Sequence, residues 1–568
     1  MAAEYIRSVD GICCGLCSLT LLVVAAASYG AGGRAAVRVD AAMRQGPVRP
    51  IWSYFGFDEP NYACMKHGRK LLAELAALSP APVYIRSHNL LCTGDGTPAL
   101  KWGSTNAYTE DAAGRPVYDW TILERIFDAY REAKVKPLVE IGFMPKALSV
   151  KPEPYQHTWP KGKLWTGWAY PPKDYAKWAE LVCQWVRHSV ERYGREEVET
   201  WLWEVWNEPD IGYWQGTPEE FHKLYDFAAD AVKRALPSAR IGGPHTTGPG
   251  NERADGFLRK FLEHCARGTN HATGKAGSPL DFVAFHAKGS PKLVNGHVQM
   301  GISNQVRSIR RGFEIVASFP EFRDTPVILG ESDPEGAAAL SARVAPQNGY
   351  RNGPLYGAYV AETIARTCEL ARRHRVNLQG SVTWAFEFEG QPFFEGFRTL
   401  ATNGIDKPVL SVFRMLGLMS GEWLAAESMG GLPVSELLEG GVRRAPDINA
   451  MAAGRDGEVS ALIWNYHDDD VAAPDAAVEL AVEHLPDSVR SVLVRHYRMD
   501  ERHSNAFTAW KQMGSPQNLT GEQYARLEAA GRLELLAEPE RMPVESGSVK
   551  LKFGLPRQGV SLIQLDWR

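Results

Sequence analysis

The chain has 568 residues, with 63 basic and 67 acidic side chains and a formal net charge of -4. Because the charge is nearly balanced and no lysine- or arginine-rich run occurs, nucleic acid is not an expected partner. Hydrophobic residues make up 44% of the chain, which predicts a globular protein of two or three domains. The cysteines beyond residue 35 are scattered and lack CxxC spacing, so neither a disulfide framework nor a metal site is predicted.

Residues 1–35 differ in composition from the rest of the chain. Gly11–Ala27 is an uncharged run of apolar and small residues, typical of the hydrophobic region of a secretory signal peptide. A short membrane anchor is the alternative, because the run is close to the minimum length that spans a bilayer. We therefore expect an exported protein, periplasmic or extracellular, with no stable membrane insertion once the signal is removed.

Between residues 51 and 424, apolar runs alternate with amphipathic stretches. The expected strands are Ile51–Phe57, Val83–Ser87, Pro137–Phe143, Trp201–Glu208, Ala239–Gly243, Asp281–His286, Pro326–Gly330 and Ser381–Phe386. The expected helices are Lys66–Leu78, Trp120–Lys134, Asp174–Tyr193, Pro218–Ala235, Ala254–Ala266, Val298–Ala317, Leu355–Arg373 and Val409–Met419. Eight such units predict an α/β fold, a (β/α)8 TIM barrel with long loops.

The pattern changes near residue 425, where short strands alternate with Gly, Pro and Asp turns. The expected strands are Val459–Asn465, Val478–Val482, Val489–Arg498, Val549–Phe553 and Gly559–Leu565, with one helix at Gln523–Leu536. This predicts a C-terminal β-sandwich domain over residues 425–568, with a structural role. Residues 36–50 precede the first barrel strand and are expected to add a strand to the β-sandwich.

Two carboxylates are predicted at the carboxyl ends of barrel strands, where such barrels place their catalytic groups. Glu208 ends the apolar stretch WLWEVWNEPD, because Pro209 cannot continue a ladder. Glu331 follows the run Val327–Leu329 in PVILGESDPEG. Taken alone, each is equally explained as turn chemistry. Two facing carboxyl groups are the smallest set of residues that can hydrolyse a glycosidic bond, so together they predict a glycoside hydrolase. The alternative is a barrel that binds glycan without catalysis.

Other polar groups fall at the same edge of the predicted barrel. A sugar site needs convergent donors and acceptors, and the candidates for substrate binding are Asn207, His88, His286, Lys288, Trp384, Glu387 and Arg398. Arg86 precedes His88 by two residues, and Glu140 lies within the third strand. Arg86 is expected to be a buried partner of Glu140 or, alternatively, a substrate contact.

Three stretches resemble known glycoside hydrolases. WEVWNEPD (Trp203–Asp210) resembles the acid/base motif of clan A, in which an Asn-Glu pair ends the fourth strand. Tyr118–Leu148 and His496–Trp510 resemble glycoside hydrolase family 39, the family of β-xylosidases and α-L-iduronidases. The resemblance extends over roughly residues 36–568. It implies a retaining mechanism without cofactor or metal, in which Glu208 is the acid/base and Glu331 the nucleophile.

The resemblance also implies roles for three neighbours of this pair. Asn207 would hydrogen-bond the sugar 2-hydroxyl, His286 would lie beside the nucleophile, and His88 would contact substrate hydroxyls. Glu208 must be protonated for the first step. Loss of the charge on Glu331 during glycosylation would then lower the pKa of Glu208 for the base step.

The sugar is less well defined by the sequence. The IRSH, IGFMP and SVTWAF pieces resemble β-xylosidases, whereas HAKG, ESDPEG and the triplet beginning at Arg398 resemble α-L-iduronidases. In the latter, a lysine and an arginine in these positions grip the uronic carboxylate, which points to Lys288. Alternatively, Lys288 pairs with a loop acid such as Glu335. The first choice is a β-xylosidase acting at the non-reducing ends of xylo-oligosaccharides, with α-L-iduronidase and α-L-arabinosidase activities as alternatives.

Overall fold

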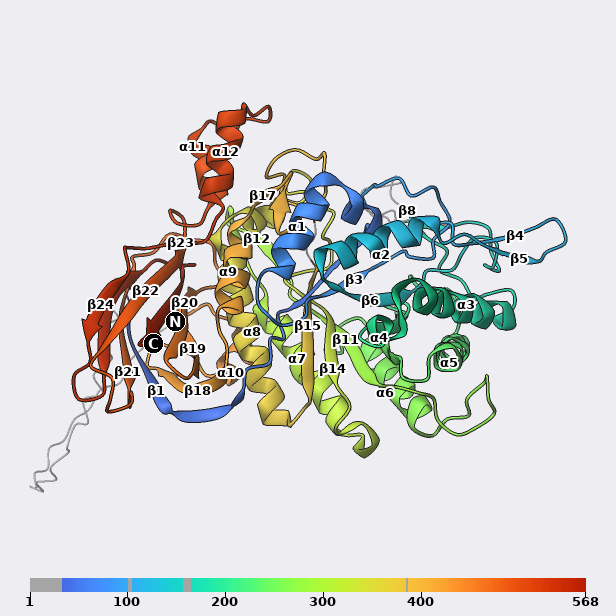
Figure 1. The fold of residues 1–568 in the computed structure, drawn as a ribbon, viewed down its shortest axis with the longest axis horizontal. Helices are drawn as coiled ribbons and strands as arrows, with labels where there is room; N and C mark the ends of the chain where they lie inside the picture. The colour runs from blue at the N-terminus through green and yellow to red at the C-terminus, as the bar shows by residue number, and fades with distance from the viewer. Residues whose placement is uncertain (1–32, 101–104, 157–164, 385–386) are drawn as a thin grey trace, which may run out of the picture.

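The computed structural model describes residues 33–100, 105–156, 165–384 and 387–568. Most of the predicted signal segment, residues 1–32, lies outside the described residues, and residues 34 and 35 already belong to the first strand. Among the described residues, no helix combines the length and apolar character needed to cross a membrane. Figure 1 shows two parts, a barrel surrounded by helices and a separate sheet domain that holds the C-terminus.

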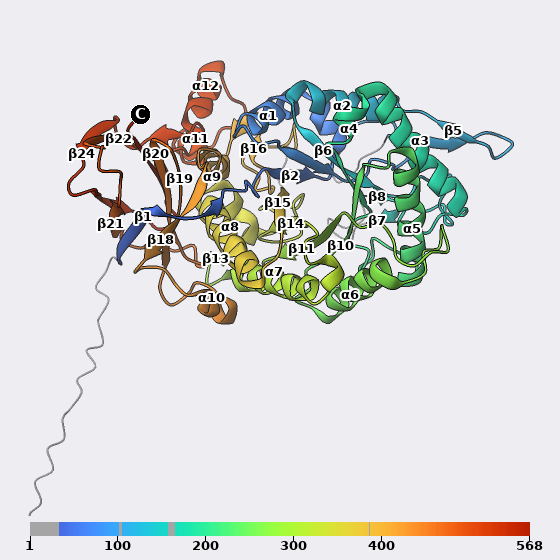
Figure 2. The same ribbon diagram turned by 60° about the horizontal axis from the view of Figure 1, so that its bottom comes forward.

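Eight parallel strands close into the predicted barrel, and their order around the barrel follows the chain. They are β2 (Tyr54–Phe57), β3 (Tyr84–Ser87), β6 (Lys136–Ile141), β9 (Leu202–Val205), β10 (Arg240–Thr246), β11 (Phe282–Lys288), β14 (Val327–Asp333) and β15 (Leu378–Trp384). In Figure 2 these strands lie at the centre of a ring of helices. The TIM-barrel prediction is confirmed.

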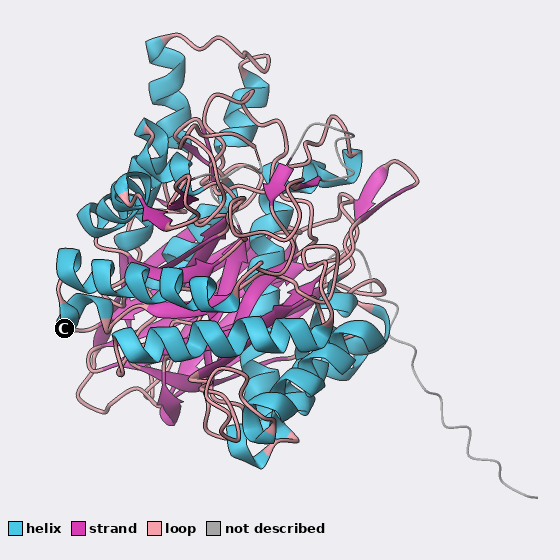
Figure 3. Ribbon diagram, turned by 90° about the vertical axis from the view of Figure 1, so that its right-hand side faces the viewer, coloured by secondary structure: helices cyan, strands magenta, loops and turns pink. Residues whose placement is uncertain are grey.

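The helices of the barrel bury one face against the strands. They are α1 (Lys66–Ala76), α2 (Thr121–Ala133), α3 (Tyr175–Tyr193), α5 (Pro218–Ala235), α6 (Glu252–Arg267), α7 (Ile302–Ala317), α8 (Pro354–His374) and α9 (Pro408–Gly417), with a short α4 (Arg195–Val198). Figure 3 shows long helices running across the outside of the strands. Helix α5 begins where predicted because Thr217 and Glu220 form a capping box ahead of its first turn.

The loops at the carboxyl end of the barrel carry short hairpins that the sequence reading missed. They are β4 (Tyr108–Glu110) with β5 (Pro116–Tyr118), β7 (Tyr155–Gln156) with β8 (Trp165–Gly167), β12 (Lys292–Val294) with β13 (His297–Gln299), and β16 (Ala401–Thr402) with β17 (Ile405–Asp406). The helix predicted from Val298 therefore begins only at Ile302. Asn295 and Gly296 both have positive φ, so this Asn-Gly pair makes a hairpin turn instead of a helix entry.

The sheet domain is one mixed sheet of ten strands that encloses a second apolar core. The strands are β1 (Arg34–Pro47), β18 (Glu422–Ser428), β19 (Asp447–Arg455), β20 (Glu458–Tyr466), β21 (Ala476–Glu483), β22 (Ser491–Met499), β23 (Glu534–Leu535), β24 (Glu540–Pro543), β25 (Val549–Leu555) and β26 (Val560–Asp566). Strand β1 lies between β18 and β21, parallel to β21. The start of the described chain therefore completes a domain built mainly from its end.

Three helices belong to this part of the chain: α10 (Val434–Gly440), α11 (Ala506–Gln512) and α12 (Gly521–Ala530). The helix predicted over Gln523–Leu536 ends at Ala530, because Glu534–Leu535 pairs with β22. In Figure 1, α11 and α12 stand out from the sheet beside the barrel loops. Tyr524 of α12 donates a hydrogen bond to the Asn403 carbonyl in one of those loops (2.9 Å), so the two parts touch here.

Candidate active site

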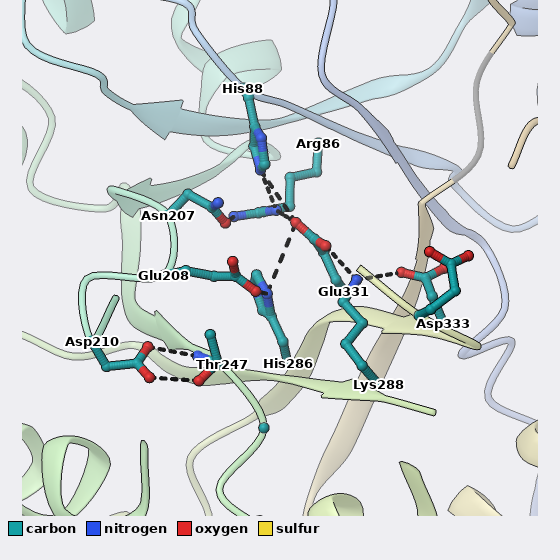
Figure 4. A network of polar contacts seen from close by, with 12 residues as sticks. Arg86, His88, Asn207, Glu208, Asp210, Thr247, His286, Lys288, Glu331 and Asp333 are labelled. Atoms are coloured by element: carbon teal, nitrogen blue, oxygen red, sulfur yellow. Dashed lines mark hydrogen bonds and ion pairs between the residues drawn. The ribbon is translucent and has the colours of Figure 1, made fainter. Parts of the chain in front are cut away.

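The loop after β9 presents Glu208 at the mouth of the barrel (Figure 4). Strand β9 ends at Val205, earlier than predicted, and Glu208 has a positive φ of 43°. The backbone N–H of Glu208 donates to the carbonyl of His245 at 2.9 Å. Two residues later, Asp210 accepts a hydrogen bond from the backbone N–H of Thr247 at 2.8 Å. The loop is thus fixed to the end of β10, and a tight turn directs the Glu208 carboxylate.

Glu208 and Glu331 face one another across the barrel mouth. One carboxylate oxygen of each lies within 4.8 Å of the other. Retaining glycosidases hold their carboxyl groups about 5–5.5 Å apart, whereas inverting enzymes leave about 6.5–9.5 Å for a water. His286 lies between the two, with Nδ1 2.9 Å from Glu208 Oε1 and 3.9 Å from Glu331 Oε1. It was expected beside Glu331, and its nearer partner is Glu208.

Three basic side chains surround the Glu331 carboxylate. The Lys288 ammonium donates to Glu331 and to Asp333, the latter at 2.7 Å. Arg86 Nη1 lies 3.1 Å from Glu331 Oε1, and His88 Nε2 lies 3.3 Å from it. Burial raises the pKa of Glu331, but the Lys288 charge and the His88 hydrogen bond outweigh burial and hold this pKa well below the usual range. Glu331 is therefore ionised, as a nucleophile must be.

Glu208, His286 and Glu331 each offer an atom that could bind a metal ion, and these three atoms lie within 4.8 Å of one another. The Lys288 ammonium and the Arg86 guanidinium already neutralise Glu331. A cation at this point would be repelled by both. The arrangement fits a carboxylate pair better than a metal site.

Arg86 connects the barrel interior to the rim. Its guanidinium is fully buried. Inside the barrel it contacts Glu140 (3.1 Å) and Glu204 (2.6 Å). At the rim it contacts Glu331 and the amide oxygen of Asn207 (3.0 Å). The expected Glu140 pair exists, but Arg86 also reaches the rim. Sequence reasoning assigned no role to Glu204. Glu204 lies within a predicted buried strand, as Arg86 does, and a charge in such a strand needs a buried partner. This signal could have identified Glu204 as a partner of Arg86.

Trp384 and His88 pack together beside Glu331. Their ring centroids are 4.2 Å apart, and the Arg86 guanidinium lies over the Trp384 ring at 5.1 Å. His88 Nδ1 lies 3.2 Å from Asp58. Although burial lowers the pKa of His88, Glu140 and the hydrogen bonds to Asp58 and Glu331 raise it to about 9. At neutral pH His88 is therefore a third cation beside the Glu331 carboxylate.

Arg398 and Glu387, two predicted substrate contacts, are placed differently. Arg398 is 1% exposed, and its guanidinium contacts Glu335 (2.7 Å), the Trp384 carbonyl (3.0 Å) and Asp333 (3.5 Å). The Lys288 ammonium contacts Glu331 and Asp333, so the alternative in which Lys288 pairs with Glu335 is wrong.

Glu387 is also buried, and one carboxylate oxygen accepts a hydrogen bond from the backbone N–H of Gly404 (2.5 Å). Burial raises the pKa of Glu387 to about 8. Among the contacts of the described residues, neither Glu387 nor Arg398 reaches the Glu208–Glu331 pair. A sequence shows that a polar residue follows a strand, but it does not show which way the loop turns the side chain.

The cations around Glu331 are expected to set the acid limit of activity. Because the pKa of Glu331 is depressed, the wild-type acid limb of kcat/KM should lie below the range of an ordinary glutamate. Removing the cation in Lys288→Met should raise the pKa of Glu331 and move that limb to higher pH. Lys292→Met, on the exposed β12, is the matched control. An unmoved limb in Lys288→Met would show that Lys288 does not tune Glu331.

A family model described as glycosyl hydrolases family 39 matches residues 35–540. The chain belongs to this family. It is therefore a glycoside hydrolase, and a carbohydrate is its substrate. The resemblance found in the sequence is confirmed at the level of the family.

Relatives of two kinds are similar to this family 39 chain. A β-xylosidase of Geobacillus stearothermophilus is 28% identical over 492 residues, 85% of this chain and 86% of the relative. An α-L-iduronidase of Mus musculus is 26% identical over 570 residues, 94% of this chain and 81% of the relative. The identities are nearly equal, so they do not decide between the two sugars.

Solved structures agree with the barrel-and-sheet fold. A monomeric β-xylosidase from Caulobacter crescentus CB15 is 24% identical and superimposes with a TM-score of 0.72, covering 94% of this chain and 99% of the other. A structure described as the bacterial orthologue of human α-L-iduronidase is 18% identical with a TM-score of 0.75, covering 94% of this chain and 84% of the other. At these identities the likeness concerns the fold alone.

Proposed function

We propose that the protein is a retaining exo-glycosidase in which Glu331 is the nucleophile and Glu208 the acid/base. The observation that carries the proposal is the separation of the two carboxylates, whose oxygens lie within 4.8 Å of one another. This distance leaves no room for the water that an inverting mechanism places between them. An ionised Glu331 held by Lys288, Arg86 and His88 supports the same assignment.

In the first step, Glu331 attacks the anomeric carbon while the glycosidic C–O bond breaks. Glu208 gives its proton to the departing oxygen, and a covalent glycosyl ester forms on Glu331. The Arg86 contact uses the amide oxygen of Asn207, so the Asn207 NH2 group is the donor available to a sugar hydroxyl. The two ring nitrogens of His88 already face Asp58 and Glu331, so His88 holds the nucleophile in place.

In the second step, the Glu208 carboxylate takes a proton from water as the water attacks the anomeric carbon, and the ester bond to Glu331 breaks. Glu331 carries no charge while it is esterified. Because a nearby negative charge has been removed, the pKa of Glu208 falls at the stage when Glu208 must act as a base. Its partner His286 has a pKa well below the usual range, because burial disfavours the imidazolium. His286 is therefore neutral and does not replace Glu208 as the proton source.

The first candidate substrate is a β-xyloside at the non-reducing end of an oligosaccharide. A uronic carboxylate would need a cation that the protein does not already neutralise. The Lys288 ammonium is held between Glu331 and Asp333, and Arg398 is buried against Asp333 and Glu335. Because both cations are used internally, a neutral pentose fits this site better. The relatives named β-xylosidase support the same choice.

The second candidate is an α-L-iduronidase-like activity. One observation favours it: Lys288 lies directly on the nucleophile, and 16% of its side chain remains exposed at the rim. A uronic carboxylate that displaced Asp333 from Lys288 would form a charge-assisted contact there. The relatives named α-L-iduronidase match over most of this chain, which supports this second candidate.

A panel of aryl glycosides separates the candidates: β-xyloside, α-L-arabinosides, α-L-iduronide and β-glucuronide. We expect wild type to prefer the β-xyloside, and Lys288→Met to lower kcat/KM without changing the ranking of sugars, since Lys288 serves Glu331. A preference for a uronide that disappears in Lys288→Met would establish the second candidate instead. If wild type hydrolyses no member of the panel, the exo-glycosidase proposal fails.

We further propose that residues 1–35 direct export and that xylan fragments outside the cytoplasm are the source of the substrate. Loss of the protein from the exported fraction on deletion of residues 1–32 would support export. Unchanged distribution between cell fractions would contradict it.

A further inference from the structure

A row of five rings crosses the barrel mouth. In order, its members are Tyr155, Tyr213, Phe143, His88 and Trp384. Successive ring centroids are 5.3, 5.6, 6.4 and 4.2 Å apart. Phe143 and Tyr155 follow β6, whereas Tyr213 follows β9, His88 follows β3 and Trp384 ends β15, so the row exists only in the folded protein. It passes beside both candidate catalytic carboxylates.

The two ends of the row lie near different carboxylates. At one end, His88 lies 3.3 Å from Glu331, and Trp384 packs on His88. At the other end, Tyr155 lies in the loop after β6. Burial and the Glu208 charge raise the pKa of Tyr155. Its ring packs on Tyr213, five residues beyond Glu208 in the loop after β9, with centroids 5.3 Å apart, so Tyr155 lies on the side of Glu208.

The acid/base end of the row is also the accessible end. Tyr213, Phe143, His88 and Trp384 are all buried, with at most 9% of their surface exposed. Tyr155 is only partly buried. Of the five rings in the row, Tyr155 is therefore the one whose surface an incoming group can reach.

The ring of Tyr155 packs against Gly212 in the loop that carries Glu208. A Cβ atom at Gly212 would lie 3.3 Å from Tyr155 Cε2, closer than most side-chain contacts. Gly212 is four residues beyond Glu208 in the same loop and one residue before Tyr213. The absence of a side chain at this position allows the ring and the loop to approach closely.

We propose that Tyr155 is the platform on which the leaving group of the substrate stacks. In a retaining hydrolase the acid/base protonates the leaving-group oxygen, so the leaving group must lie on the side of Glu208. A sugar or aryl ring has an apolar face that packs on an aromatic side chain. This inference rests on the proposed function and adds the residue that selects substrates with a ring on the leaving side.

The first test compares two substrates that share the same sugar: a disaccharide, and a glycosyl fluoride whose leaving group has no ring. We expect Tyr155→Ala to lower kcat/KM for the disaccharide about tenfold and to leave the fluoride within about twofold. Tyr155→Phe keeps the ring and should resemble wild type on both. An equal loss on both substrates, or no loss on either, would overturn the proposal.

The second test measures binding without turnover, in a Glu331→Gln background. We expect the disaccharide to bind more tightly than the monosaccharide, and this advantage to fall about tenfold on adding Tyr155→Ala. Gly212→Ala, which leaves the tyrosine but displaces it, should lower the same advantage in part. An undiminished advantage in Tyr155→Ala would overturn the proposal. Because this arm needs no catalysis, it decides the role of Tyr155 even if wild type fails to hydrolyse the panel.

Discussion

Replacement of Glu331 by Gln is expected to lower kcat by at least about a thousandfold, the largest effect of any single substitution in the site. The amide has nearly the same shape as the carboxylate but is a far weaker nucleophile. The substitution also leaves Lys288 and Arg86 facing a neutral group, so the variant should unfold at a lower temperature than wild type. Thermal unfolding therefore accompanies the kinetic measurement, which is made well below the transition.

The matched control is Glu140→Gln, which replaces a second buried carboxyl group on Arg86. Glu140 has no place at the reacting carbon, so we expect it to retain far more activity than Glu331→Gln. A 2-fluoro glycoside, whose ester hydrolyses slowly, should leave its sugar on the peptide that contains Glu331 in wild type. A label on a different carboxylate, or activity in Glu331→Gln close to that of Glu140→Gln, would remove Glu331 from the role of nucleophile.

Replacement of Glu208 by Ala should separate substrates by their leaving groups. For a poor leaving group such as a sugar, loss of the general acid should cost about a hundredfold to ten-thousandfold in kcat/KM. An aryl leaving group of low pKa needs no proton, so its departure should be little affected. The glycosyl ester on Glu331 should then accumulate, because the base for the second step is also missing.

Added azide should restore turnover of the activated substrate in Glu208→Ala, since this anion fits where the carboxylate was and attacks without a base. Glu204→Gln is the control, because Glu204 lies four residues earlier on β9 and contacts Arg86 and not the reacting groups. We expect it to lose activity on both substrates and to be insensitive to azide. Rescue of Glu204→Gln, or no rescue of Glu208→Ala, would mean that the acid/base is assigned to the wrong residue.

Much of the barrel was accessible from the sequence because its strands are short buried runs followed by turns. The runs ending near Glu208 and Glu331 fixed which strands these residues follow, and closure of the barrel brought them face to face. The length of β9 was predicted less well. Trp206 and Glu208 adopt positive φ, which non-glycine residues seldom do and which the apolar pattern does not reveal.

The charged residues were predicted less well because their partners lie on different strands. Arg86, Glu140 and Glu204 form one buried network only after the barrel has closed. Arg398 follows the last strand, as a rim residue would, yet the loop folds it inward onto Glu335. Loop direction depends on long-range packing, and spacing along the chain carries little information about it.

The most direct test of the account is the configuration of the first product, followed by NMR on the glycoside of the panel that wild type hydrolyses fastest. If Glu331 forms a covalent intermediate that water opens with help from Glu208, the sugar is released with the anomeric configuration of the substrate. Double displacement predicts β-xylose as the first species from a β-xyloside, with the α-anomer appearing only through later mutarotation. Initial release of the opposite anomer would contradict double displacement by this carboxylate pair.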